Sequence, residues 1–135
     1  SCEREICALS DLVVKSGIVG QNALGDERVL QGSELLDKGD LKGFGALMYD
    51  SHESSRNWFE NSCEELDAIV DAAKAIPEVY GARLSGGGFG GSCCLLVDPA
   101  AADKIAAAIT KEYRAKYGDE PVCSLIKPSK GAYII

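Results

Sequence analysis

The densest chemical signal in the sequence is the stretch from Ser85 to Ser92. It reads Ser-Gly-Gly-Gly-Phe-Gly-Gly-Ser, so five of its six inner residues are glycine. Glycine loses more conformational freedom on folding than any other residue, and such a cluster implies positive φ angles or the close approach of a ligand or another backbone segment. Because the stretch lies between two apolar segments and contains Phe89, we favour a structured loop over a flexible linker. Its backbone amides can line an anionic or polyhydroxyl site.

Two known phosphate-binding motifs match this loop only in part. Gly86, Gly88 and Gly91 have the spacing G-x-G-x-x-G of dinucleotide-binding folds. That motif needs a helix after it, and here a strand is expected, so no helix N-terminus is available for the pyrophosphate. A Walker A loop ends in Gly-Lys-Ser/Thr, but this loop ends in Gly90-Gly91-Ser92 without the lysine. Both interpretations are therefore set aside.

Four other side chains have both a chemical and a structural interpretation. Arg83, just before the loop, either contacts phosphate or pairs with an acidic helix face. His52 has an imidazole that titrates near neutral pH, yet no triad partners are recognisable around it, which favours a capping or packing role. Trp58 and Phe59 can stack on a sugar, but their position beside a helix end favours core or interdomain contacts. Of the four, only Arg83 is kept as a candidate site residue.

The six cysteines favour neither disulfides nor a metal site. Cys93 and Cys94 lie in the apolar run 93–97, and Cys123 lies in the apolar run 122–126. In such runs a thiol behaves as a small buried hydrophobe. The sequence has no C-x-x-C pair and a single histidine, so no metal is expected. Reduced core cysteines are typical of a cytoplasmic protein, and no signal peptide or membrane-length apolar run is visible.

Length and charge narrow the function classes. The chain has 135 residues, about one domain on the usual scale of ~100–200 residues. Its 14 Lys and Arg against 21 Asp and Glu give a formal net charge of −7. A field of this sign repels phosphate backbones and anionic lipid head groups, which disfavours nucleic-acid and membrane partners. With 46% hydrophobic and 26% charged residues, the composition is that of an ordinary globular domain.

Helical periodicity dominates the first third of the chain. Apolar residues at helical spacing predict helices over residues 2–15, 22–38 and 41–55. Gly39 is placed to end the second of these helices, and Asp40 is placed to cap the third. The second and third helices should therefore form a helical hairpin.

A further helix is expected after residue 62. The run from Ser62 to Glu65 has the pattern of a capping box, in which the Ser62 hydroxyl accepts a hydrogen bond from the Glu65 amide. Pro77 ends the helix. Its buried face should consist of Leu66, Ile69, Val70 and Ala73.

The pattern changes to strands after residue 81. Asp98 followed by Pro99 interrupts them and predicts the start of a helix that ends at Gly118. Strands beside several helices indicate an α+β sandwich in which helices cover one face of the sheet. The expected strands are 82–85, 92–97, 122–127 and 132–135.

The glycine loop and its flanks resemble the third motif of the GHMP small-molecule kinases. The stretch from Gly81 to Gly91 matches the pattern G-x-R-[ML]-[TS]-G-G-G-F-G-G, the form found in galactokinases. Upstream, the same family's patterns G-D, M-x-x-S-H-x-S-x-R and S-x-x-x-L-D are matched by residues 39–40, 48–56 and 62–67. The combination of these motifs in this order is specific.

The resemblance runs from about Gly25 to the C-terminus. Residues 127–132 are similar to the family's closing segment. Ser55, the run from Asn57 to Phe59 and Ser92 depart from the family's usual residues, and none of these departures removes the loop.

The resemblance implies a fold and a role. It implies that residues 1–135 form one domain, the C-terminal domain of a galactokinase-like ATP-dependent sugar 1-kinase. The implied core is ferredoxin-like, an antiparallel sheet with helices on one face. In the complete enzyme, Mg-ATP and galactose would meet between this domain and an N-terminal kinase domain. One backbone wall of that site would be formed by Ser85, Gly86, Gly87, Gly88, Phe89, Gly90, Gly91 and Ser92.

The sequence also lacks parts of the family's pattern. The first two motifs and the catalytic Asp of the family are absent from it. We therefore expect no catalytic residue in this chain, and no activity or tightly bound cofactor in the chain alone. The expected partner is an N-terminal kinase domain, in cis or as a separate chain, and an exposed interdomain face could also support a homo-oligomer.

Two other function classes fit the same residues. One is a stand-alone ferredoxin-like module that binds or regulates a small molecule without catalysis. The other is a structural interaction domain whose glycines only allow close backbone packing. The identity of the sugar is left open, because the implied sugar-contacting residues lie outside this sequence.

Overall fold

The computed structural model describes residues 5–8, 23–128 and 134. A four-stranded sheet and four α-helices account for most of these residues, and short π-helical (Ser55–Phe59) and 3₁₀ (Pro99–Ala101) turns join some of them. In chain order the elements are β1 (Glu5–Ala8), α1 (Ala23–Asp37), α2 (Leu41–Ser54), α3 (Glu64–Lys74), β2 (Val79–Ser85), β3 (Ser92–Val97), α4 (Ala102–Tyr117) and β4 (Val122–Ser124).

The predicted α+β class is confirmed, and the sheet has the order β2-β3-β1-β4. The hairpin β2–β3 is antiparallel, as expected, with Arg83 opposite Cys94 and Ser85 opposite Ser92. The short β1 lies parallel to both β3 and β4, so the sheet is mixed rather than antiparallel throughout. The reason is the connection through α4, because a helix after β3 returns the chain to the same end of the sheet and makes β4 parallel to β3.

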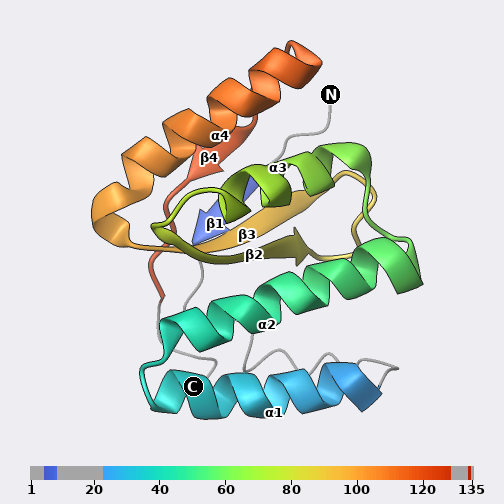
Figure 1. The fold of residues 1–135 in the computed structure, drawn as a ribbon, viewed down its shortest axis with the longest axis vertical. Coiled ribbons are helices and arrows are strands. Elements are labelled where there is room, and N and C mark those ends of the chain that lie inside the picture. Colours follow the sequence, from blue (N-terminus) through green and yellow to red (C-terminus); the bar gives the residue numbers. More distant parts are fainter. Residues whose placement is uncertain (1–4, 9–22, 129–133, 135) are drawn as a thin grey trace.

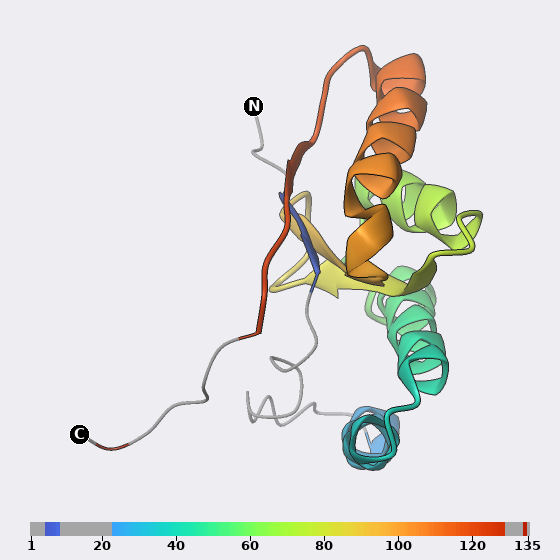
Figure 2. The same cartoon turned by 90° about the vertical axis from the view of Figure 1, so that its left-hand side faces the viewer.

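Alternate residues of β3 belong to two different apolar clusters. Cys93 and Leu95 pack with α3 and α4, which cover one face of the sheet (Figure 2). Cys94 and Leu96 pack with Phe44, Met48 and neighbouring apolar side chains of the α1–α2 hairpin. Because successive side chains of a strand point to opposite faces, β3 is buried on both. The larger cluster contains Leu66, Ile69, Val70, Ala73, Val79, Ala82, Leu84, Cys93, Leu95, Ile105, Ile109 and Tyr113.

Helix α2 runs alongside β2 at the edge of the sheet (Figure 1). The approach is so close that a Cβ atom on Gly45 would lie 1.9 Å from the carbonyl oxygen of Tyr80. A Cβ atom on Gly81 would lie 2.4 Å from the Cα atom of Gly45. Glycine at both positions therefore lets the helix backbone touch the strand backbone, and this contact places the end of α2 beside the end of β2.

Local capping rules predicted most helix ends correctly. Gly39 has φ +72° between α1 and α2, and the Asp40 side chain accepts a hydrogen bond of 2.9 Å from the Gly43 amide. Asp98 likewise accepts from the Ala100 amide at 3.0 Å, and Gly118 ends α4 with φ +70°. The predicted buried face of α3 is also confirmed.

Three local predictions were wrong or incomplete. The predicted helix over 2–15 is wrong at residues 5–8, which form β1, because a central position between β3 and β4 offers hydrogen bonds on both sides. The capping box is wrong, because α3 begins after Cys63 with no side-chain cap and the Ser62 hydroxyl donates to Asp67 instead. Strand β4 ends at Ser124, and the predicted strand over 132–135 lies, apart from Ile134, outside the described residues.

Candidate functional site

The glycine loop joins β2 to β3 and adopts a backbone that few residues other than glycine tolerate. Gly86, Gly88 and Gly90 have φ of +73°, +83° and +95°, and Phe89 has φ +55°. Left-handed angles are strained for side chains with a Cβ atom, whereas glycine adopts them freely. The positive φ angles inferred from the glycine cluster are therefore confirmed, and the loop is a turn of defined shape.

A segment far away in sequence holds the tip of this loop. The Phe89 amide donates a hydrogen bond of 2.8 Å to the carbonyl oxygen of Asn61. The Asn61 side-chain amide donates to the carbonyl oxygen of Gly87 at 3.4 Å. Gly88 fits against the same residue so tightly that its Cβ atom would lie 1.9 Å from the Asn61 carbonyl oxygen. Asn61 is not among the residues predicted for the site, because no motif spacing links it to the loop.

The other side of the loop is open. A Cβ atom on Gly86 or Gly87 would meet nothing within 4 Å. Among the described residues, the amides of Gly86, Gly87 and Gly88 donate no hydrogen bond. Successive free amides in a glycine turn form a concave site for anionic oxygens. The loop can therefore bind an anion or a polyhydroxyl group through its backbone.

Arg83 lies two residues before the loop, on β2, but the structure gives it no acidic partner in the part of the chain that it describes. Its Nε atom is buried without a hydrogen-bond partner. Burial lowers the pKa of Arg83, and the charge of Arg28 lowers this pKa further. Pairing with an acidic helix face is therefore not observed among the described residues. A contact with phosphate stays a prediction.

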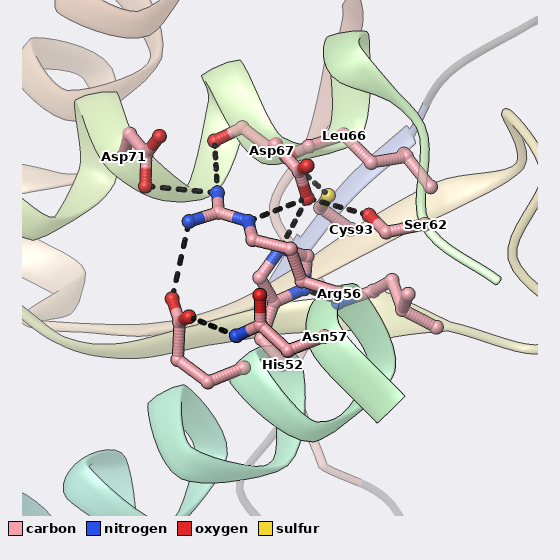
Figure 3. A network of polar contacts seen from close by, with 10 residues as sticks. His52, Arg56, Asn57, Ser62, Leu66, Asp67, Asp71 and Cys93 are labelled. Atoms are coloured by element: carbon pink, nitrogen blue, oxygen red, sulfur yellow. Dashed lines mark hydrogen bonds and ion pairs between the residues drawn. The ribbon is translucent and has the colours of Figure 1, made fainter. Parts of the chain in front are cut away.

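His52 connects α2 to the root of the loop (Figure 3). The side chain is fully buried, and its Nδ1 atom accepts a hydrogen bond of 3.1 Å from the Leu84 amide of β2. Because Nδ1 accepts a hydrogen bond from the backbone amide, the proton of the neutral ring is on Nε2, which donates to Asp67 at 2.9 Å. The packing role predicted for His52 is confirmed, and its partner is the strand that leads into the loop.

Asp67 is the centre of the polar network around His52. Its Oδ1 atom accepts from His52 and, at 2.6 Å, from the Ser62 hydroxyl. The same atom lies 3.1 Å from Nε of Arg56 in an ion pair (Figure 3). The Nη2 atom of Arg56 donates to Asp71, and its Nη1 atom donates to Glu53. The network joins the end of α2, the π-helical turn and the start of α3. It thereby fixes the segment that contains Asn61.

The network also determines the protonation states of its members. Burial lowers the pKa of His52 below its ordinary value of 6.5, although Asp67 acts in the opposite direction. Burial alone would raise the pKa of Asp67, but hydrogen bonds from Ser62 and Arg56 outweigh this and lower it below 3.8. At neutral pH the network therefore contains a neutral imidazole and an ionised carboxylate.

Three aromatic side chains near the loop are exposed. Trp58 is 83% exposed, Phe59 is 54% exposed and Phe89 is 76% exposed. Trp58 and Phe59 end the π-helical turn just before Asn61, and Phe89 is bound to Asn61 through its amide. The prediction that Trp58 and Phe59 pack in the core is therefore wrong. Interdomain or ligand contacts stay open for all three.

The site offers no cluster of metal ligands in the described part of the chain. Among these residues, no group of three or more His, Cys, Asp or Glu side chains could hold a metal ion. The described cysteines, Cys63, Cys93, Cys94 and Cys123, form no disulfide, and burial raises the pKa of Cys63, Cys93 and Cys123. What these residues offer a ligand is backbone amides and the Arg83 guanidinium.

The comparisons with known proteins give the family. The family model described as "GHMP kinases C terminal" matches residues 33–115, which include the polar network and the glycine loop. This chain belongs to the GHMP kinases. The resemblance found in the sequence is therefore confirmed over residues 33–115.

Relatives of this GHMP kinase chain include galactokinases from a mammal and a bacterium. The chain is 42% identical over 111 residues to the galactokinase of Homo sapiens, covering 81% of this chain and 28% of the relative. Its identity to the galactokinase of Thermotoga maritima is 40% over 106 residues, covering 78% of this chain and 30% of the relative. The chain thus spans less than a third of the length of these relatives.

A solved galactokinase has the same fold over most of the chain. The crystal structure of Lactococcus lactis galactokinase complexed with galactose matches with a TM-score of 0.67 and 30% identity. The match covers 71% of this chain and 25% of the solved chain. The α+β fold of the GHMP kinase C-terminal part is therefore supported by a known structure as well as by the sequence.

The family motifs have clear structural roles in this GHMP kinase chain. Asp40 caps α2, and the third motif forms the loop itself. His52 and Arg56, which belong to one motif, meet the Ser62–Asp67 run, which is another, in a single network beside the loop. The upstream motifs therefore support the third.

Proposed function

We propose that this chain is the C-terminal part of a galactokinase-type, ATP-dependent sugar 1-kinase. In the complete kinase, by which we mean this chain joined to or mixed with its N-terminal lobe, the glycine loop forms one wall of the phosphoryl-transfer site. The observation that carries the proposal is a loop of free backbone amides on a chain about 40% identical to galactokinases. A reaction that depends on positioning and charge stabilisation suits such a wall.

The residues present fit the phosphate groups of ATP better than they fit its metal. The amides of Gly86, Gly87 and Gly88 can bind phosphate oxygens, and Arg83 can add a positive charge. When bound, Mg-ATP supplies the phosphoryl group and most of the positive charge near it. Among the described residues no group of three or more His, Cys, Asp or Glu side chains could hold Mg²⁺, and we assign its ligands to the N-terminal lobe.

An assay with galactose and Mg-ATP tests the proposal directly. The complete kinase should convert galactose to galactose 1-phosphate, and the 135-residue chain alone should show no turnover. Robust turnover by the isolated chain would contradict the proposal that catalysis needs the N-terminal lobe. Binding of a sugar phosphate to the chain without turnover by the complete kinase would favour the stand-alone binding module instead.

Gly87 is expected to matter for activity and not for folding. Its Cβ atom would meet nothing within 4 Å and its φ is not positive, so Gly87→Ala should leave the thermal midpoint unchanged. In the complete kinase the added methyl group would stand between the loop and the phosphates, and kcat/KM should fall about tenfold or more. Initial rates with galactose and ATP measure this change.

Gly39→Ala is the matched control for this prediction. Gly39 also faces open space, but its φ is +72° and it lies at the other end of α2 from the loop (Figure 1). Alanine there should lower the free energy of unfolding by about 1 kcal/mol and leave kcat/KM unchanged. If Gly87→Ala kept full activity, no ligand or lobe would approach the loop at that point.

Trp58 can report the docking of the N-terminal lobe. It is the single tryptophan of the sequence and is 83% exposed, so its fluorescence in the isolated chain should be that of a hydrated indole. Addition of the N-terminal lobe should shift the emission to shorter wavelength, with the Trp58→Phe chain plus lobe as the blank. A shift that depends on chain concentration alone would instead indicate a homo-oligomer. An emission maximum that never moves would place the interface elsewhere.

A cytoplasmic location is part of the proposal. In the ranges that the structure describes, no helix has both the length and the apolar character needed to span a bilayer. A sugar kinase needs ATP, and the described cysteines form no disulfide. Both features suit a reducing compartment that contains ATP.

A further inference from the structure

Asn61 contacts the glycine loop through both its backbone and its side chain. The Asn61 carbonyl oxygen binds the Phe89 amide, and its side chain binds the Gly87 carbonyl. The Asn61 amide donates to the carbonyl oxygen of Ser55 at 3.2 Å. The π-helical turn therefore fixes the backbone of Asn61. Asn61 in turn contacts three consecutive loop residues, Gly87, Gly88 and Phe89.

Backbone strain is concentrated on both sides of this contact. Glu60, with φ +49°, and Phe89, with φ +55°, are the non-glycine residues that have positive φ in the described part of the chain. One precedes Asn61 and the other is hydrogen-bonded to it. Strained residues persist only where the surrounding structure holds them, and they gather at sites where shape has a function.

The Asn61 side chain also carries an unpaired atom. Its Oδ1 atom is buried and has no hydrogen-bond partner in the structure. The bond that its Nδ2 atom makes to Gly87 is long, at 3.4 Å. A buried acceptor without a donor lowers stability. The Asn61 side chain therefore contributes little to the free energy of unfolding, although it contacts the loop.

We propose that Asn61 is a positioning residue of the phosphoryl-transfer site. It binds the carbonyl of Gly87 and the amide of Phe89 from behind, and this orients the free amides of residues 86–88 toward the open side of the loop. The role rests on the proposed function, because the loop must form a wall of the kinase site for its shape to affect the rate. Asn61 acts through the loop and touches no substrate.

A pair of matched substitutions tests this role in the complete kinase. Asn61→Asp keeps the shape of the side chain but places a carboxylate oxygen against the Gly87 carbonyl, which should push the loop tip away. Asn57→Asp makes the same change four residues earlier, where the side chain donates to Glu53 and not to the loop. The kcat of Asn61→Asp should fall between about 10-fold and 100-fold with a smaller change in the KM for galactose, while Asn57→Asp retains the wild-type kcat.

Asn61→Ala separates positioning from stability. It removes the unpaired acceptor together with a weak bond, so the thermal midpoint should stay the same or rise. Its kcat should nevertheless fall, in the same direction as in Asn61→Asp but by less, because no repulsion is added. A residue with a purely structural role would show the reverse, a lower midpoint and an unchanged kcat for the folded fraction.

Amide hydrogen exchange gives a readout that does not depend on the kinase reaction. In the wild-type protein the Phe89 amide should be protected, and in Asn61→Asp its exchange should be at least several-fold faster, while amides of β3 are unchanged. Unchanged exchange at Phe89, or equal kcat values for the two Asp variants, would overturn the proposal. If the wild-type complete kinase had no activity on galactose, the proposed function would fail, and the exchange result would still decide whether Asn61 positions the loop.

Discussion

Gly45→Ala should lower the stability of the folded chain more than any of the other proposed substitutions. Its Cβ atom would lie 1.9 Å from the Tyr80 carbonyl oxygen and 2.8 Å from the Gly81 amide nitrogen, and both are backbone atoms that cannot rotate away. Helix α2 would have to move off β2, which would separate Phe44 and Met48 from Cys94 and Leu96. We expect a loss of about 4 kcal/mol or more in a protein whose whole stability is on the order of 5–15 kcal/mol. Urea unfolding followed by circular dichroism measures the change.

The expected effect of Gly45→Ala has the opposite sign to that of Gly→Ala in an ordinary helix. In an unobstructed helix, Gly→Ala stabilises by about 1 kcal/mol, because alanine has the highest helix propensity. Ala46→Gly is the control, since Ala46 is the next residue of α2 and is exposed. It should cost about 1 kcal/mol, the propensity difference alone. A stabilised Gly45→Ala variant would mean that α2 does not touch β2 as described.

Loss of the His52 side chain should have the second largest effect. His52→Ala leaves the Leu84 amide without its acceptor, removes a donor from Asp67 and creates a cavity in a fully buried site. Buried unpaired groups and cavities together account for about 3 kcal/mol or more. His52→Asn should cost less, because the asparagine Oδ1 atom can replace Nδ1 as the acceptor for Leu84. Thermal unfolding at pH 7.5 compares the two variants.

The same histidine should make the protein sensitive to acid. Its pKa in the folded protein is below 6.5, so between that pKa and 6.5 the unfolded chain binds more protons than the folded one. The free energy of unfolding therefore decreases as the pH falls below 6.5. Protonation of Nδ1 also breaks the hydrogen bond from Leu84. The lowered pKa of Asp67 adds a second loss of stability below pH 3.8.

The absence of other histidines allows this acid phase to be assigned. His52 is the single histidine of the sequence, so its replacement by asparagine should remove the decrease that begins near pH 6.5. The decrease that Asp67 contributes below pH 3.8 should persist. A wild-type thermal midpoint that stays constant from pH 7.5 to 5 would contradict the neutral state inferred for the buried imidazole.

Local sequence patterns were reliable wherever the structure depends on a few adjacent residues. Asp40 and Asp98 cap helices, because an Asx side chain reaches amides two or three residues further on. The glycine loop was recognisable for the same reason, since positive φ is a property of single residues. Ser62 is the exception. Its hydroxyl donates to the charged carboxylate of Asp67, and this bond is stronger than the bond from the Glu65 amide that the local pattern predicts.

The sequence by itself determined the family, most helix ends and the position and backbone character of the glycine loop. Only the tertiary structure decided what holds that loop, because its supports are far away along the chain. Leu84 is bound by His52, 32 positions earlier, and Gly87 is bound by Asn61, 26 positions earlier. The strand at residues 5–8 likewise exists only because β3 and β4 offer partners on both sides. Such contacts depend on the path of the whole chain. The backbone contact of Gly45 with Tyr80 and Gly81 contributes to this path, because it places α2 against β2. No local spacing of residues encodes that path.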